Sequence, residues 1–149
     1  MEPTEAEAEA GAGRRPVQDE AGPPVRTPGL RQEVGARGED LAVAELQRQG
    51  MQIVARNWRC KLGEIDVVAV DVEQARRTLV FCEVKCRTGL GFGAPLESIT
   101  HTKLRKLRQL AAHWLATEPC HADDIRLDAI GVVLLPGARP ELTHVRGIG

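Results

Sequence analysis

The chain has 149 residues, enough for one domain, and its 42% hydrophobic content is enough for a single core. No apolar run approaches the roughly 18 to 20 residues of a membrane span, and the N-terminus lacks the basic-then-apolar order of a secretory signal. These features disfavour a membrane or secreted protein. We expect a cytoplasmic protein whose four cysteines are reduced thiols that serve as small hydrophobic residues.

The formal net charge of −1 is unevenly distributed along the chain. Residues 1–30 hold six acidic and three basic residues among Ala, Gly and Pro, with almost nothing to bury. We therefore expect a disordered acidic tail there. Without it, 17 basic and 15 acidic residues remain, a net charge of +2. A mildly basic folded part permits a polyanionic partner without requiring one.

The first half of the folded part predicts a helix followed by three strands. Residues 33–49 contain good helix formers and no proline, and Gly50 stands in the stop position. Apolar and polar residues then alternate over 51–57, which predicts a strand. Two further strands, 65–70 and 78–87, are separated by a short polar turn. We therefore expect them to form an antiparallel hairpin.

The second half predicts one helix and one more strand. A Gly-rich loop leads into residues 102–117, where apolar side chains recur at helical spacing. Residues 126–135 are too apolar for a strand exposed on both faces. Together these elements give the order α-β-β-β-α-β and an α/β domain over 31–135, with a mixed sheet flanked by helices. Prolines and glycines interrupt the pattern in 136–149, which we expect to be loosely ordered.

The predicted hairpin brings acidic residues together. If its turn is centred at 74–75, residues whose numbers sum to 149 face each other, so Asp66 lies opposite Glu83 and Glu64 opposite Lys85. Two facing carboxylates repel each other unless a cation lies between them. Carboxylate oxygens are hard ligands suited to Mg²⁺ or Mn²⁺. The polar side of this hairpin therefore predicts part of a metal site.

We assign the roles in this site as follows. Asp66 and Glu83 bind the metal, and Lys85 stabilises the charge on a phosphate or positions the attacking water. We expect Glu39 to be a further member of the site, holding the metal directly or through water, because its helical neighbours are small or apolar and place it at the margin of the buried face. Glu64 is expected to be an outlying carboxylate or a partner for Lys85 rather than a ligand.

Each of these residues also has a purely structural interpretation. Glu83 and Lys85 could form a surface salt bridge of little energetic value. Asp66 could be a hydrogen-bonding residue at the start of its strand. Glu39 could be a first-turn acid favoured by the helix dipole.

The second predicted helix carries basic residues and no acidic residue between His101 and Trp114. Its cations are Lys103, Arg105, Lys106, Arg108 and, when protonated, His113. Such a helix is either a plain solvated face or a surface that tracks phosphates beside the active site.

Three further motifs have simpler interpretations. "GLGFGA" formally fits a dinucleotide-binding pattern, but the required helix does not follow at once, so we interpret it as a substrate loop with Phe92 at its tip as a wedge against a base. "PCHADD" lacks the partner set of a zinc site and is interpreted as a loop. Arg126 and Asp128 share a strand face and predict an ion pair.

Four segments together resemble a known family, the YraN-like family of uncharacterised bacterial proteins. They are "GARGEDLAVAEL", "NWRCKLGEIDVVAVD", "VFCEVKCRTGLGFGAPLESIT" and "KLRKLRQLAAHWL", and they cover roughly residues 33–134. That family is similar to the PD-(D/E)XK nuclease superfamily, near the archaeal Holliday-junction resolvases. The resemblance implies a restriction-endonuclease-like fold. It also implies cleavage of DNA phosphodiester bonds with Mg²⁺ or Mn²⁺.

Carried onto this chain, the resemblance makes Asp66 the motif aspartate, Glu83 and Lys85 the (D/E)XK pair, and Glu39 the acid from the helix. Basic residues near them are expected to contact DNA: Arg87, Lys103 and Lys106. We expect an endonuclease acting on branched or otherwise structured DNA, and the resemblance suggests a homodimer. The alternatives are a non-catalytic DNA-binding or adaptor protein that retains the nuclease fold, and a protein–protein module whose acidic tail binds a partner.

Overall fold

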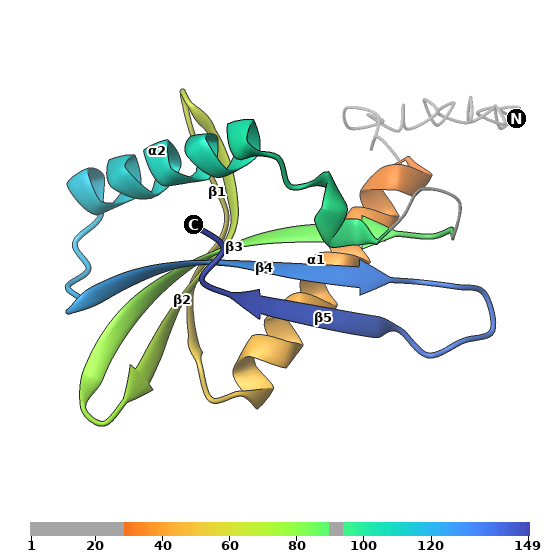
Figure 1. Ribbon diagram of the computed structural model, residues 1–149, viewed down its shortest axis with the longest axis horizontal. Coiled ribbons are helices and arrows are strands. Elements are labelled where there is room, and N and C mark those ends of the chain that lie inside the picture. Colours follow the sequence, from red (N-terminus) through yellow and green to blue (C-terminus); the bar gives the residue numbers. More distant parts are fainter. Residues whose placement is uncertain (1–28, 90–93) are drawn as a thin grey trace, which may run out of the picture.

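The computed structural model describes residues 29–89 and 94–149 (Figure 1). A five-stranded sheet in the order β1-β2-β3-β4-β5 forms the centre of the molecule. Its strands are β1 (Gln52–Cys60), β2 (Gly63–Glu73), β3 (Arg76–Arg87), β4 (Asp124–Val133) and β5 (Glu141–Arg146). The helices are α1 (Leu30–Arg48), the short 3-10 helix η1 (Pro95–Ser98) and α2 (His101–Thr117). The expected α-β-β-β-α-β order is confirmed, with η1 and β5 in addition.

The sheet is mixed, as expected. β3 pairs antiparallel with β2 but parallel with β4, and β5 returns antiparallel to β4. A parallel pair needs a long crossover connection, and here η1 and α2 lie in the connection between β3 and β4.

All but the last two residues of the predicted acidic tail lie outside the described residues, and so does Phe92. Among the described helices, none is both long and apolar enough to cross a bilayer.

The two long helices cover opposite faces of the sheet (Figure 1). In β3, Val80 and Cys82 belong to the apolar cluster that α1 closes, whereas Leu79 and Phe81 belong to the cluster that α2 closes. Successive strand residues point to opposite faces, so the alternation places one helix on each side. The α2 face also contains Trp114, whose ring packs edge-on against Phe81 with centroids 5.7 Å apart.

The predicted register of the hairpin is confirmed over the paired residues, but the two predicted pairs, Asp66 with Glu83 and Glu64 with Lys85, lie beyond the last backbone partners. β2 and β3 pair from Val67 opposite Cys82 to Glu73 opposite Arg76, so the partner numbers sum to 149 throughout. The turn residues 74 and 75 have φ values of 50° and 65°. Positive φ at both turn positions matches the twist of the flanking strands, although neither residue is Gly or Asn.

We expected the C-terminal segment to be loosely ordered, but it contains β5. β5 pairs with β4 from Glu141 to Arg146, and it also contacts the carboxylate of Asp128, which is 0% exposed and hydrogen-bonded. Arg126 donates to it at 2.8 and 3.0 Å, which confirms the predicted ion pair. His144 of β5 lies 2.8 Å away, and the backbone N–H of Gly147 donates at 3.1 Å. Two of these partners come from the C-terminal segment and hold it against β4.

Candidate metal site

The site begins where the pairing of β2 with β3 ends. The last backbone partners are Val67 and Cys82, and Asp66 lies one residue beyond. There the Oδ2 atom of Asp66 accepts the backbone N–H of Val84 at 2.8 Å. Asp66 therefore has a structural hydrogen bond, as we considered, although it lies inside β2 and not at its start, and this bond holds the carboxylate at the edge of the ladder.

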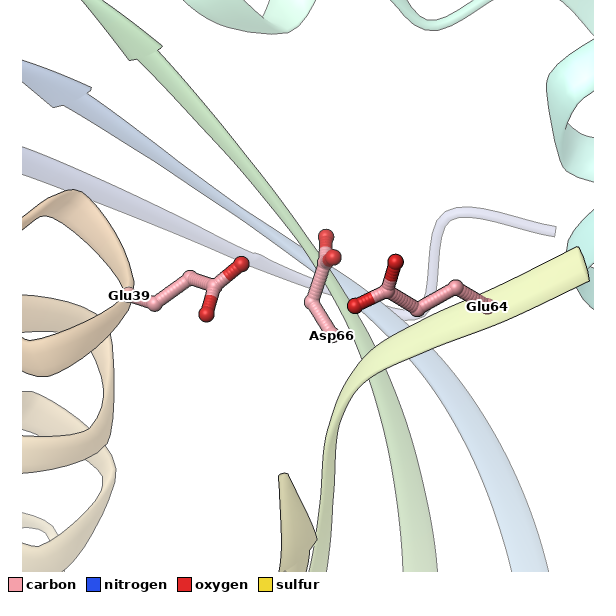
Figure 2. A group of neighbouring side chains, drawn as sticks. All are labelled: Glu39, Glu64 and Asp66. Carbon is pink, nitrogen blue, oxygen red and sulfur yellow. The ribbon is translucent and has the colours of Figure 1, made fainter. Parts of the chain in front are cut away.

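Asp66 is the middle member of a cluster of three half-buried carboxylates, with Glu39 and Glu64 (Figure 2). One oxygen of each lies within 4.8 Å of the others. Figure 2 shows Glu39 reaching from α1, and Glu64 from β2, toward Asp66. Two oxygens that bind one Mg²⁺ at about 2.0–2.1 Å can be at most about 4.2 Å apart. Small side-chain rotations would therefore let one ion contact the cluster.

The electrostatics of the cluster favour a cation. Burial, together with the nearby negative charges of Glu83 and Glu39, raises the pKa of Asp66 to about 7 against the lowering effect of the Val84 hydrogen bond. Burial also raises the pKa of Glu39. A divalent ion would lower the pKa values of both carboxylates, because it attracts the ionised form of each ligand.

Glu83 lies beside this cluster but outside it. Its Oε1 atom pairs with the Nζ atom of Lys85 at 2.8 Å, so the salt bridge considered from the sequence is present. Burial lowers the pKa of Lys85, but the hydrogen bond and the charge of Glu83 outweigh this and raise it above its ordinary value. Lys85 therefore stays protonated and can donate to an anion.

Glu64 belongs to the acidic cluster, although it was not predicted to be a ligand. We expected an outlying carboxylate or a partner for Lys85, but Lys85 pairs with Glu83 instead. The contact of Glu64 with Arg59 is longer, at 3.5 Å. The sequence did contain a signal, because Glu64 and Asp66 are two residues apart and side chains at that spacing share a face of a strand.

Two local features bring Glu39 to the sheet. The preceding residue, Gly38, is buried, and a Cβ there would lie only 2.8 Å from the Cβ of Cys86 in β3. Glycine therefore lets α1 approach the sheet closely. Asn57 of β1 hydrogen-bonds to the Glu39 side chain, which partly offsets the burial that raises the pKa of Glu39. Asn57 has φ 49° and was not predicted from the sequence to belong to the site.

The basic residues expected to contact DNA gather on the α2 side of the site. Lys103, at the start of α2, lies against Lys85, and the hydrogen bond and charge of Lys85 lower the pKa of Lys103. Arg87, at the end of β3, contributes to the same lowering by its charge. Lys106 lies one turn further along α2 and borders a cavity together with Lys103. Neighbouring cations of this kind favour an anion between them.

The loop that contains "PCHADD" makes structural contacts. Asp123 accepts the backbone N–H of Arg77 at 2.9 Å, and Asp124 pairs with Arg76 at 2.5 Å. These bonds join the start of β4 to the start of β3. The glycine-rich segment 90–93 lies outside the described residues.

The comparisons with known proteins agree with one another. The sequence model of "Uncharacterised protein family UPF0102" matches residues 38–132, which contain the whole acidic cluster. The "UPF0102 protein" of Mycobacterium ulcerans is 50% identical over 119 residues, covering 80% of this chain and 96% of the relative. That of Nocardia farcinica is 46% identical over 120 residues, covering 80% and 91%. That of Mycobacterium tuberculosis is 49% identical over 122 residues, covering 80% and 94%.

Proposed function

The chain belongs to the uncharacterised protein family UPF0102, and we propose that it is a Mg²⁺- or Mn²⁺-dependent DNA endonuclease. It would hydrolyse phosphodiester bonds in branched or otherwise structured DNA. The observation that carries the proposal is the cluster of Glu39, Glu64 and Asp66 directly beside the cation of Lys85. Phosphodiester hydrolysis needs two parts: carboxylates that bind a hard cation, and an ammonium group that binds phosphate.

The donor set fits a hard divalent ion. Mg²⁺ commonly takes one or two carboxylates and completes its shell with water and phosphate oxygens. Asp66 and one of the two neighbouring glutamates would suffice, with the other acting through water. Such an ion would supply charge neutralisation at the phosphate and a more acidic water.

The lysines would provide the protein's own charge stabilisation. Lys85 remains protonated, so it acts as a hydrogen-bond donor to a phosphate oxygen or to the attacking water, not as a base. When its ammonium group turns to the phosphate, Glu83 loses its partner at 2.8 Å and becomes free to act as the metal ligand that the sequence predicts. Lys103 would bind the same phosphate from α2.

DNA would be held beyond the reacting bond by basic side chains. Arg87 and Lys106 flank the site on the α2 side and would contact neighbouring phosphates. Phosphate contacts position the nucleic acid without reading its sequence. Binding should therefore weaken as salt increases, with a slope that reflects the number of phosphates contacted.

Cleavage assays test this proposal directly. The purified full chain is incubated with labelled branched, single-stranded and duplex DNA in MgCl₂, MnCl₂ or EDTA. We expect metal-dependent cleavage, fastest on the branched DNA and reduced at least a hundredfold by Asp66→Asn or Lys85→Ala.

A matched pair of substitutions on α1 provides the control. Glu39→Gln should reduce cleavage, whereas Glu33→Gln, on an exposed position of the same helix, should not. Cleavage that persists in Asp66→Asn and Glu39→Gln would place the activity elsewhere.

The Glu83–Lys85 pair supports one alternative, a non-catalytic DNA-binding or adaptor protein. Because Glu83 and Lys85 together carry no net charge, fewer negative charges at the site need a metal ion to balance them than if all four carboxylates were unpaired. Such a protein would bind DNA, give no heat on titration with Mn²⁺, and leave all three DNAs intact. Calorimetry with MnCl₂ thus separates the two functions.

A further inference from the structure

A cavity of about 170 Å³ lies between α2 and the start of β2, next to the acidic cluster. Its walls are apolar side chains from α2, from the segment before it and from the C-terminal segment. They are Ile99, Leu104, Leu107, Leu110 and Ile148. Gly63 of β2 faces these side chains, because a Cβ built there would lie 3.5 Å from Lys106 and 3.7 Å from Leu110. The cavity is therefore enclosed between α2 and the sheet.

The rim of this cavity carries charges of both signs. Glu64 and Glu83 border it on the side of the sheet, and Lys103 and Lys106 border it on the side of α2. Glu64 also belongs to the acidic cluster, so the cavity and the candidate metal site share a residue. A group that enters the cavity would consequently lie next to anything bound at the cluster.

We propose that the cavity receives the base of one unpaired nucleotide next to the phosphodiester that is held at the acidic cluster. This inference rests on the proposed function. Pockets for drug-sized ligands usually measure about 300 to 1,000 Å³, so 170 Å³ suits a single small ring system. A base matches the walls with its apolar faces and matches the rim with the hydrogen-bond donors and acceptors of its edge.

The charged rim argues against a purely aliphatic occupant. Such a group would cover Glu64 and Lys106 without offering a hydrogen bond to either, and burying unpaired polar groups is unfavourable. A nucleotide instead brings a phosphate that complements Lys85 and Lys103, which already lie side by side. The neighbouring charges thus select a ring that is attached to an anion.

The proposal narrows the substrate class. A base inside duplex DNA is paired and stacked, so it must be turned out before it can enter a protein cavity, and this is easiest for a base that is already unpaired. We therefore infer that the preferred DNA has an unpaired nucleotide beside the reacting bond, as at a bulge or a branch point.

The test compares two DNA duplexes that differ by a single base. One carries a central bulged adenosine nucleotide, and the other carries an abasic tetrahydrofuran residue at the same bulge, so their phosphates are equal in number. Binding of the full chain is measured by fluorescence anisotropy in CaCl₂. We expect the bulge with a base to bind about tenfold more tightly.

Substitutions on α2 locate the effect. Leu104→Trp fills the cavity and should make the two affinities equal. Leu115→Trp is the matched control, because Leu115 is also half-buried on α2 but lines a different hollow. It should keep the tenfold difference. If circular dichroism shows that Leu104→Trp is unfolded, Ile148→Trp fills the same cavity from the C-terminal segment.

Cleavage of the same DNAs in MnCl₂ separates this inference from the proposed function. Equal binding of both bulges by the unsubstituted chain would overturn the inference, and cleavage of both would leave the nuclease proposal intact. A tenfold difference that is lost only in the cavity-filling variants would support the base site. If that difference came with no cleavage, the hydrolase proposal alone would fail.

Discussion

The Oδ2 atom of Asp66 accepts the backbone N–H of Val84 at 2.8 Å, just beyond the last backbone pair of the β2–β3 ladder. The bond occupies a peptide donor that would otherwise have no partner in a partly buried position. It also fixes the direction of the Asp66 side chain. Asparagine can keep this bond through its carbonyl oxygen, whereas alanine cannot. Asp66→Asn therefore removes the charge with the least change in hydrogen bonding.

The first prediction concerns the stability of the metal-free protein. The pKa of Asp66 is raised from 3.8 to about 7 by burial and by Glu83, so the folded state keeps a proton that the unfolded state releases. Stability should therefore fall as pH rises from about 4 to 7, and the full cost is present above 7. Asp66→Asn should be more stable than the unsubstituted chain at pH 8 by about 1 to 3 kcal/mol.

Urea unfolding in EDTA at pH 5 and pH 8 measures this difference. The gain from Asp66→Asn should be smaller at pH 5 than at pH 8, because the folded protein still keeps its proton on Asp66 at pH 5 and only part of the cost has developed. Glu33→Gln, at an exposed position of α1, is the control and should change stability little at either pH. A loss of stability in Asp66→Asn at pH 8 would show that its carboxylate is favourably placed without a cation.

The second prediction concerns the pH dependence of Mn²⁺ binding. The ion binds the ionised carboxylate, so a proton must leave Asp66 at any pH below its pKa of about 7. The association constant should rise up to about tenfold per pH unit below 7 and then level off. Calorimetry in two buffers with different ionisation enthalpies should detect proton release near pH 6 and little near pH 8. A constant affinity across this range would contradict the role of Asp66.

The sequence predicts those features that depend on neighbouring residues. The hairpin register follows from the turn at 74–75, because the pairing of one turn fixes all pairs beyond it. The C-terminal end of α1 follows from Gly50, whose φ of 92° is suited to a helix end, whereas its start lies at Leu30, three residues before the predicted one. Asp66 was identified for the same reason, since its place in the hairpin is local.

The features that the sequence did not predict depend on distant contacts. The alternating pattern places Glu64 on the same strand face as Asp66, but it does not show that the backbone pairing stops at Val67 or that Lys85 pairs with Glu83 on its own strand. β5 was missed because its contacts are with residues distant in the sequence: its backbone pairs with β4, and His144 contacts the carboxylate of Asp128, sixteen residues earlier. Local breakers in 136–149 concealed this long-range contact.

The third prediction concerns the close approach of α1 to the sheet. Gly38→Ala would place a Cβ 2.8 Å from the Cβ of Cys86, which forces the helix to move away. We expect a loss of about 1 to 3 kcal/mol in unfolding free energy and weaker Mn²⁺ binding, because Glu39 moves with the helix. Gly35→Ala is the matched control on the same helix, since nothing lies within 4 Å of its added Cβ.

The control should behave in the opposite way. Gly35→Ala should stabilise the protein by about 0.5 to 1 kcal/mol, through the better helix propensity of alanine, and leave Mn²⁺ binding unchanged. Urea unfolding and calorimetry on the two variants give both quantities. Equal effects of the two substitutions would show that the contact between α1 and β3 does not position Glu39.

The fourth prediction concerns the buried carboxylate that orders the C-terminal segment. Burial raises the pKa of Asp128, but the hydrogen bonds from His144, Arg126 and the Gly147 backbone outweigh it, so the pKa lies below its ordinary value. The ionised form therefore contributes stability above the unfolded pKa of about 3.9, and this contribution is lost as pH falls through the lower folded pKa. Asp128→Asn should cost about 3 kcal/mol at pH 7, because it removes the nearer of the two carboxylates that pair with Arg126 and leaves only Asp71 at 3.2 Å.

Acid unfolding tests that assignment. The difference between the unsubstituted chain and Asp128→Asn should shrink below about pH 4, where the carboxylate gains a proton. Amide hydrogen exchange at pH 7 should show β5 exchanging faster in the variant, while β2 and β3 keep their protection. Asp124→Asn is the control, because Asp124 forms an exposed pair with Arg76 that should contribute little. Unchanged exchange in β5 would mean that its pairing with β4 does not depend on Asp128.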